Sequence, residues 1–292
     1  MSDKNLRVFN GATAIVTGGA SGIGRAIGEE LARRGCEVVL ADLQIELAEE
    51  VASNIRAAGG KAEARELDVT NFSTVERLVQ ETSERYGHLD YMFNNAGIAI
   101  SGPVSLHTVE DWNYIIDINL RGVVNGVQAA YKIMLKQGFG HIVNTASMAG
   151  LMPTAGNSSY ATTKHAVVYL SNILRAEAAM DNVQVSVLCP GFIRTPILEG
   201  GGKYGKNLIE LTPEQERKIR NNVEKFKPMP PKIFAQKALN AIAKGKAIII
   251  IPSWYRLYWW LDRLSPSLMM FLVRKSHQAM GKIMDTGDIH KG

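Results

Sequence analysis

Tyr160 and Lys164 lie four residues apart in a segment whose apolar pattern predicts a helix, so both should occupy one face of it. A free phenol has a pKa of about 10, too high for ready proton exchange near neutral pH. A neighbouring ammonium group favours the phenolate and lowers that pKa. The pair could therefore act as an acid/base couple, although Tyr and Lys at this spacing also occur on ordinary helix surfaces.

A glycine-rich turn, Thr-Gly-Gly-Ala-Ser-Gly-Ile-Gly at 17–24, connects the first predicted strand to a predicted helix. Glycine permits the close backbone approach that a phosphate needs, and the start of a helix offers unpaired N–H groups. Any tight strand-to-helix turn uses glycine, but this position near the start of the chain favours a dinucleotide-phosphate loop.

Asp42 ends the second predicted strand, 18 residues after Gly24. A carboxylate there can accept hydrogen bonds from the adenosine ribose hydroxyls and would repel a 2′-phosphate. It could also cap the following helix, and the two roles are compatible. Because no Lys or Arg occupies 19–21 or directly follows Asp42, the sequence favours NAD over NADP.

Short apolar runs alternate with helical stretches along the chain. Runs that are apolar on both faces indicate a parallel sheet covered on both sides, and right-handed crossovers then give a doubly wound α/β sheet in one domain. The predicted strands are 12–17, 37–41, 62–67, 91–94, 141–145, 184–188 and 247–251.

Residues 192–232 interrupt this alternation before the last strand. The sequence Thr212-Pro213-Glu214-Gln215 predicts a capped helix start with Pro at the first helical position. Long excursions of this kind are often functional, so we favour a substrate lid over a plain surface insertion. The predicted organisation is a catalytic domain over 1–252 with this lid, followed by a helical, aromatic-rich extension over 253–292.

Composition excludes several classes of protein. The chain has 292 residues, 46% of them hydrophobic and 21% charged, as in an ordinary folded domain. The net charge of +5 could suggest nucleic acid, but over most of the length basic residues are interspersed with acidic ones, so we expect no nucleic-acid partner.

The two cysteines, Cys36 and Cys189, each lie beside an apolar run and are expected to be buried free thiols, which suits a reducing compartment. No residues have metal-ligand spacing, so no metal is expected. The first residues lack the apolar core of a secretory signal, and no run of 18 apolar residues occurs. We therefore expect a cytoplasmic protein.

Several motifs together are far more specific than any one of them. The order of these motifs along residues 8–251 closely resembles that of the short-chain dehydrogenase/reductase family. The motifs are the glycine loop, Asn94-Asn95-Ala96-Gly97, Asn119, Ser147 thirteen residues before Tyr160, the Tyr160-x-x-x-Lys164 pair and Pro190-Gly191.

The resemblance implies a Rossmann-type seven-stranded parallel sheet with strand order 3-2-1-4-5-6-7. It also implies four catalytic residues. Tyr160 would exchange a proton with the substrate oxygen, and Ser147 would hydrogen-bond that oxygen. Lys164 would lower the pKa of Tyr160 and hold the nicotinamide ribose. Asn119 would bind a water that links Lys164 to solvent.

The resemblance further implies a cofactor site. Asp68 and Val69 would contact the adenine, and Ile193 and Thr195 would meet the nicotinamide carboxamide. Asn94, Ala96 and Gly97 would line the cofactor and support the central sheet. The full expected set is Gly18, Ser21, Gly22, Ile23, Gly24, Asp42, Leu43, Asp68, Val69, Asn95, Ala96, Gly97, Tyr160, Lys164, Pro190, Gly191, Ile193 and Thr195.

The implied activity is NAD-dependent hydride transfer between a secondary, apolar alcohol and its ketone, acting on CH–OH donors. An NADP-dependent reductase of 3-oxoacyl groups or ketones and a non-catalytic dinucleotide-sensing protein are the alternatives. Family members are commonly homodimers or homotetramers built through the helices near 110–137 and 159–180, so a homo-oligomer is expected.

The composition changes after residue 251. One helical stripe carries Trp254, Leu257, Tyr258, Leu261 and Leu264, and Ser265-Pro266 predicts the start of another helix. From Lys244 to Lys282 there are seven Lys or Arg residues and one acid, Asp262. Two interpretations stay open: the tail contacts a membrane surface or frames an entrance for lipophilic substrate, or it packs on the domain or a partner subunit.

Overall fold

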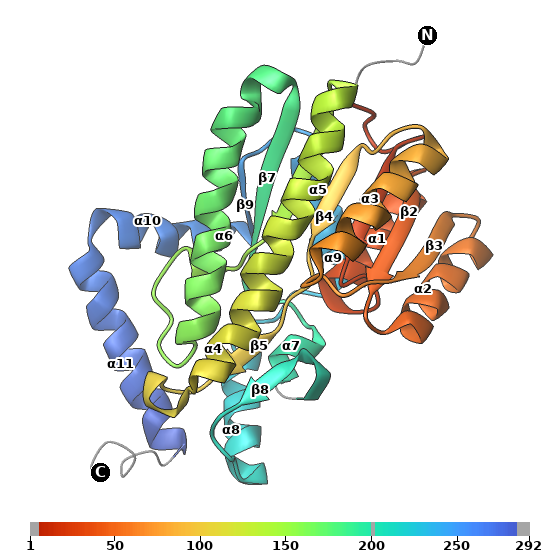
Figure 1. Ribbon diagram of the computed structural model, residues 1–292. Helices are drawn as coiled ribbons and strands as arrows, with labels where there is room; N and C mark the ends of the chain where they lie inside the picture. Colours follow the sequence, from red (N-terminus) through yellow and green to blue (C-terminus); the bar gives the residue numbers. More distant parts are fainter. Residues whose placement is uncertain (1–5, 200–201, 285–292) are drawn as a thin grey trace.

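The central element is a seven-stranded parallel sheet. The computed structural model describes residues 6–199 and 202–284. The strands are β1 (Thr13–Thr17), β2 (Glu37–Asp42), β3 (Lys61–Glu66), β4 (Tyr91–Asn94), β6 (Gly140–Thr145), β7 (Val183–Pro190) and β9 (Ile248–Ile251). Their spatial order is β3-β2-β1-β4-β6-β7-β9, which confirms the predicted Rossmann-type order 3-2-1-4-5-6-7 in a single domain (Figure 1).

Helices cover both faces of the sheet, as the crossover rule requires. One layer consists of α1 (Gly22–Arg33), α2 (Ile45–Ala57) and α9 (Pro231–Ile242). The other consists of α3 (Phe72–Tyr86), α5 (Gly122–Gln137) and α6 (Ser158–Glu177). In Figure 1 the long helices α5 and α6 lie in front of the sheet.

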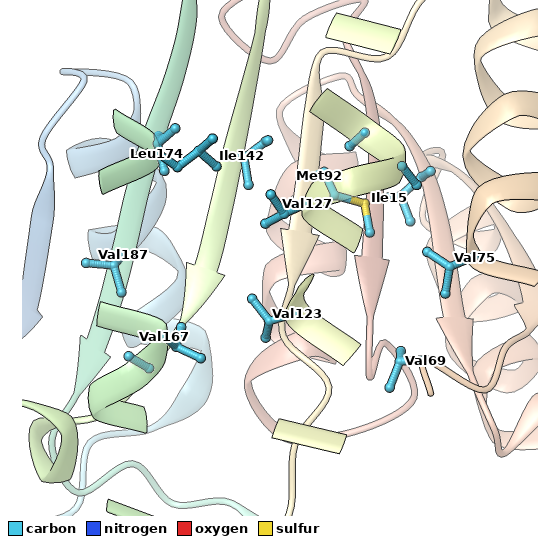
Figure 2. Close-up of a cluster of buried hydrophobic side chains, with 14 of the residues drawn as sticks. Ile15, Val69, Val75, Met92, Val123, Val127, Ile142, Val167, Leu174 and Val187 are labelled. Atoms are coloured by element: carbon cyan, nitrogen blue, oxygen red, sulfur yellow. The ribbon is translucent and has the colours of Figure 1, made fainter. Parts of the chain in front are cut away.

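Each face of the sheet has its own hydrophobic core, because successive side chains of a strand point to opposite faces. In β1, Ile15 packs in the core beneath α3, α5 and α6, whereas Ala14 and Val16 pack in the core beneath α1, α2 and α9. Figure 2 shows the first of these clusters, where Ile15 and Met92 of the sheet lie near Val127 of α5. Two-sided burial explains why these strands are apolar throughout.

The predicted helix over 109–137 is continuous but not uniform. It comprises α4 (Val109–Ile116), a π-helical turn η2 (Asp117–Arg121) and α5. A π-helical turn widens the helix by one residue and is frequent at functional sites. Here it contains Asn119.

The segment 192–232 contains α7 (Pro196–Glu199), the short 3₁₀ turn η5 (Gly202–Tyr204), β8 (Gly205–Asn207) and α8 (Pro213–Glu224). The predicted capping box is confirmed: the side chains and backbones of Thr212 and Gln215 bond reciprocally. β8 pairs in parallel with β5 (Ala99–Ser101), a contact that the sequence did not predict. This two-stranded sheet attaches the segment to the chain just after β4.

The described residues after Pro252 are largely helical, and residues 285–292 of the predicted extension lie outside the described part of the chain. α10 (Arg256–Leu264) and α11 (Pro266–Met284) contact each other, and α11 also packs against α8 (Figure 1). None of the helices in the described residues is both long and apolar enough to cross a bilayer. The remaining 3₁₀ turns are η1 (Val104–Leu106), η3 (Met148–Gly150), η4 (Ala178–Asp181) and η6 (Ser253–Tyr255).

Candidate active site

A cavity of about 400 Å³ opens at the carboxyl ends of the parallel strands. This edge is where doubly wound sheets bind their ligands. Most of the expected cofactor residues line the cavity: Gly18, Ser21, Gly22, Ile23, Asp42, Leu43, Asp68, Val69, Asn95, Ala96, Gly97, Tyr160, Lys164, Pro190 and Thr195.

The glycine loop has the geometry that a phosphate requires. Gly18 (φ 65°) and Gly22 (φ 53°) adopt the left-handed conformation that glycine favours. A Cβ at Gly24 would overlap the carbonyl oxygen of Gly18. The side chain of Ser21 makes no capping hydrogen bond, and the first turn of α1 has no acidic residue. The backbone N–H groups there can therefore bind an anion, and the residues present fit a dinucleotide phosphate.

Asp42 ties the end of β2 to this loop. Its Oδ2 accepts a hydrogen bond of 3.0 Å from the backbone N–H of Ala20, and its Oδ1 accepts one of 3.0 Å from that of Gln44. Each carboxylate oxygen has a second lone pair, so Asp42 can still accept bonds from a ribose on its cavity side.

Lys164 is buried at the base of the cavity, with 3% of its surface exposed. Its Nζ donates a 2.9 Å hydrogen bond to the backbone carbonyl of Thr145 and lies 5.7 Å from the centre of the Tyr160 ring. Burial lowers the pKa of Lys164 to about 8, because desolvation disfavours the ammonium form. The lysine and tyrosine predicted to act together are thus adjacent on α6.

Tyr160 is half-buried, and burial raises the pKa of its phenol. A hydrogen bond with Ser147 acts in the opposite direction and favours the phenolate. Desolvation has the larger effect, so the pKa of the Tyr160 phenol lies above its usual value in this arrangement. That Lys164 lowers this pKa stays a prediction.

Ser147 follows β6 and begins the turn η3. Its Oγ accepts a 3.1 Å hydrogen bond from the backbone N–H of Ala149. The oxygen is therefore held in place while its proton remains free to donate. The hydroxyl hydrogen of Ser147 is therefore available to donate to Tyr160 or to a substrate oxygen bound beside Tyr160.

Asn119 is fully buried in the π-helical turn. Its side chain bonds both backbone groups of Ile98: Oδ1 accepts from the N–H at 2.8 Å, and Nδ2 donates to the carbonyl at 2.9 Å. Nδ2 also lies 3.3 Å from Oγ1 of Thr163 on α6. Asn119 thus holds the chain after Gly97 against the catalytic helix.

Gly97 lies between two of the expected catalytic side chains. A Cβ at this position would be 3.1 Å from Oδ1 of Asn119 and 3.2 Å from Nζ of Lys164. Both contacts are tighter than ordinary packing permits, so a side chain at residue 97 would displace one of the two groups. The glycine lets the cavity wall, Asn119 and Lys164 converge.

The other expected residues lie behind the cavity wall. Ile193 is buried in the hydrophobic core, and the ring of Tyr255 fills the space beside Gly191. Asn94 is buried and is not among the residues that line the cavity; it bonds within the sheet, from its Nδ2 to Oδ1 of Asn144 at 2.9 Å. Gly24, at the end of the glycine loop, packs against the carbonyl oxygen of Gly18.

The cavity also has lining residues that sequence reasoning missed. Tyr114, Asp117 and Ile118 have helical spacing and face it together, a pattern visible in the sequence next to Asn119. Ile197, Lys203 and Tyr204 come from the segment 192–232 and depend on how that segment folds over the site. The remaining ones are Gln44, Leu67, Thr70, Ile98, Thr145, Ala146 and Pro196.

Comparison with known proteins agrees with this architecture. Residues 12–203 match the family model described as short chain dehydrogenase. The chain belongs to this family of oxidoreductases, whose sheet and dinucleotide cavity it shares.

Two curated relatives match different shares of this chain. A 2,5-dichloro-2,5-cyclohexadiene-1,4-diol dehydrogenase of Sphingobium indicum is 38% identical over 187 residues, 64% of this chain and 75% of that protein. A probable oxidoreductase of Mycobacterium bovis, EphD, is 32% identical over 268 residues, which is 91% of this chain but 45% of that longer protein.

Among solved structures, a short chain dehydrogenase/reductase from Burkholderia phymatum in complex with NAD superposes with a TM-score of 0.81. It is 31% identical, and the match covers 90% of this chain and 96% of that one. The cavity described above therefore belongs to a fold that binds a nicotinamide dinucleotide.

Proposed function

We propose that this chain is an NAD-dependent dehydrogenase that interconverts a secondary, apolar alcohol and its ketone. The observation that carries the proposal is that Tyr160 and Lys164 line the same cavity as the glycine loop, whose geometry suits a phosphate. A non-catalytic dinucleotide sensor would have no need for this pair.

The reaction divides between cofactor and protein. The bound nicotinamide would supply the hydride acceptor or donor. In the oxidative direction Tyr160, as the phenolate, takes the hydroxyl proton of the alcohol, and in the reductive direction Tyr160, as the phenol, returns it. Ser147 donates a hydrogen bond to the same substrate oxygen, where charge develops.

Lys164 and Asn119 serve proton transfer. Lys164, with a pKa of about 8, is able to lose and regain a proton near neutral pH, which a surface lysine is not. Asn119 holds the backbone at Ile98 beside it. We assign Lys164 to the ribose of the nicotinamide and Asn119 to the water that completes the proton path.

The preference for NAD rests on Asp42. Its carboxylate faces the cavity at the end of β2, where it would accept the ribose hydroxyls and repel a 2′-phosphate. The Burkholderia phymatum relative was solved with NAD, which supports the same choice. Asp68 and Val69 would contact the adenine, and Thr195 the carboxamide.

The substrate end of the cavity supports an apolar substrate. Ile98, Ile118, Ile197, Tyr114 and Tyr204 are among the residues that line the cavity, and we place them at the end that would hold the substrate. The segment 192–232 would act as a lid over the catalytic domain (1–252), with 253–292 as an extension. We also propose a homodimer or homotetramer and a cytoplasmic location, the latter supported by the two buried free cysteines.

The decisive experiment is a panel of secondary alcohols, from short aliphatic to steroid-sized and aryl compounds, assayed with NAD and with NADP by absorbance of the reduced cofactor. The proposal expects turnover of apolar members with NAD. Tyr160→Phe should retain NADH binding by fluorescence and lose turnover by about 10²–10⁴-fold. Full activity of Tyr160→Phe would refute the assignment, and faster turnover with NADP would favour the alternative reductase.

A further inference from the structure

The two C-terminal helices expose large apolar side chains. On α10, Leu257, Trp260 and Leu264 follow one another at three and four residues, so they share one face. Leu257 is 74% exposed and Leu264 79%. A helix on the surface of a domain ordinarily presents polar residues outward, so this face is unusual.

The first turns of α11 continue this pattern. Leu268, Phe271 and Leu272 share a helical face and are all exposed. The sides of α10 and α11 that face the domain are apolar as well. Trp259 packs against the core beneath α6, and Met269 is 1% exposed. Packing on the domain therefore accounts for one side of each helix and leaves the outward side unexplained.

Unneutralised positive charge accompanies the exposed apolar residues. Arg256, Arg263, Arg274 and Lys275 are exposed, and within the described residues none of them forms an ion pair. Exposed bases elsewhere in the described residues include paired ones, such as Lys132 with Glu76 at 3.0 Å, and unpaired ones, such as Lys136 and Lys232. The four bases on α10 and α11 thus have no acidic partner in the described part of the chain.

The bases lie next to the aromatic rings. The guanidinium carbon of Arg263 is 5.4 Å from the centre of the Trp259 ring, and Nζ of Lys275 is 5.7 Å from that of Phe271. Cations beside Trp and Phe on an amphipathic helix are typical of the boundary between lipid headgroups and acyl chains.

We propose that the outward face of α10 and α11 binds the surface of an anionic lipid bilayer. The apolar side chains would enter the headgroup region, and the bases would pair with lipid phosphates. This surface, the tail face, consists of Leu257, Trp260, Leu264, Leu268, Phe271 and Leu272 with Arg256, Arg263, Arg274 and Lys275.

A second copy of the chain fits this face less well. A two-fold contact brings the same patch of both copies together, so the four bases of one would face the four of the other. Like charges at an interface repel and oppose association. An anionic bilayer instead complements both the charge and the apolar character.

The position of the tail face adds a consequence. α11 packs against α8, and the segment 192–232 that contains α8 also contributes Ile197 and Tyr204 to the cavity (Figure 1). A bilayer on the tail face would lie beside that segment. An apolar substrate dissolved in the bilayer would then enter from this side, a consequence that rests on the proposed function, whereas the binding itself does not.

Flotation of the full-length protein with vesicles tests the proposal. Vesicles of phosphatidylcholine with phosphatidylglycerol should carry the protein upward, and the bound fraction should fall as sodium chloride is added. Vesicles of phosphatidylcholine alone should bind about tenfold less, because their zwitterionic headgroups give the surface no net negative charge to attract the bases.

Two triple variants separate the contributions. Leu257→Ser/Trp260→Ser/Leu264→Ser removes apolar insertion, and Arg256→Gln/Arg263→Gln/Lys275→Gln removes charge. Each should weaken binding to the anionic vesicles about tenfold or more, with the melting temperature unchanged, because the replaced side chains are exposed.

Val8→Ser/Met180→Ser is the matched control. Val8 is 62% exposed and Met180 95% exposed, and both are apolar residues outside α10 and α11. It should bind as the wild type does. Absence of flotation with anionic vesicles would overturn the proposal, and so would unchanged binding by the apolar variant. A change in the sedimenting mass of the apolar variant with vesicle binding intact would assign the face to a second copy instead.

Discussion

Nζ of Lys164 donates a 2.9 Å hydrogen bond to the backbone carbonyl of Thr145, nineteen residues earlier in the chain. The bond fixes a cationic side chain in a site where burial lowers its pKa to about 8. Between about pH 8 and about pH 10.4, the value for a free lysine, the unfolded chain binds a proton that the folded protein does not. The contribution of Lys164 to the free energy of unfolding therefore rises with pH over this window.

Lys164→Met removes this dependence. We expect the stability of the wild type relative to Lys164→Met to increase by up to about 1.4 kcal/mol per pH unit between about pH 8 and pH 10. Urea unfolding at several pH values measures it, and Lys132→Met on the exposed side of α5 is the control. A stability difference that stays flat across the window would show that the ammonium is not desolvated in the folded protein.

Gly97→Ala tests the convergence at the base of the cavity. The new Cβ would lie 3.1 Å from Oδ1 of Asn119 and 3.2 Å from Nζ of Lys164, so one of them must move. Because small displacements of catalytic groups are costly, we expect kcat to fall about tenfold to a hundredfold.

Gly138→Ala provides the comparison for that variant. Gly138 ends α5 with φ 80°, and nothing lies within 4 Å of the added Cβ. The substitution strains the backbone and should lower the melting temperature without changing kcat. If both variants lose kcat in proportion to stability, Gly97 has no special role in the site.

The fold was predictable because its signals are local or periodic. The apolar runs of β1 and β4, the glycine turn before α1 and the capping box at Thr212 each specify their own element. β5 and β8 escaped prediction because three-residue strands carry too short a pattern, and their pairing joins segments over a hundred residues apart.

The sequence predicted most of the residues that line the cavity, but it did not predict the pKa values of the groups there. Residues such as Gly18, Asp42 and Lys164 face one cavity because parallel strands end at one edge. The pKa of Tyr160 depends instead on how deeply the folded protein desolvates the phenol. Tyr204 reaches the cavity only through the tertiary course of the segment 192–232, which no local pattern encodes.

Asp42→Asn should change the choice of cofactor. The neutral amide keeps an acceptor for the loop N–H of Ala20 but no longer repels a 2′-phosphate. We expect the ratio of kcat/KM for NADP to that for NAD to rise about tenfold or more, as removal of a close like charge predicts. Steady-state kinetics with both cofactors measures it. Glu46→Gln, an exposed acid in the first turn of α2, should leave the ratio unchanged.

His141 gives the fold a sensitivity to acid. It is buried in β6, where its Nε2 lies 2.8 Å from Oγ of Ser186, and Nδ1 has no hydrogen-bond partner among the described residues. Burial, with a smaller effect of Arg175, lowers the pKa of His141 to about 3. Below about pH 6.5 the unfolded chain therefore takes up a proton that the folded protein does not, and stability falls as the pH falls.

We expect the wild type to lose up to about 1.4 kcal/mol of unfolding free energy per pH unit below about pH 6.5 through this residue. His141→Gln keeps a polar side chain for Ser186 and should lose that part of the slope, even if it is less stable near neutral pH. Urea unfolding from about pH 7 to about pH 5 compares the two, with His277→Gln on α11 as the control. Equal slopes for the wild type and His141→Gln would show that the imidazole is free to accept a proton in the folded sheet.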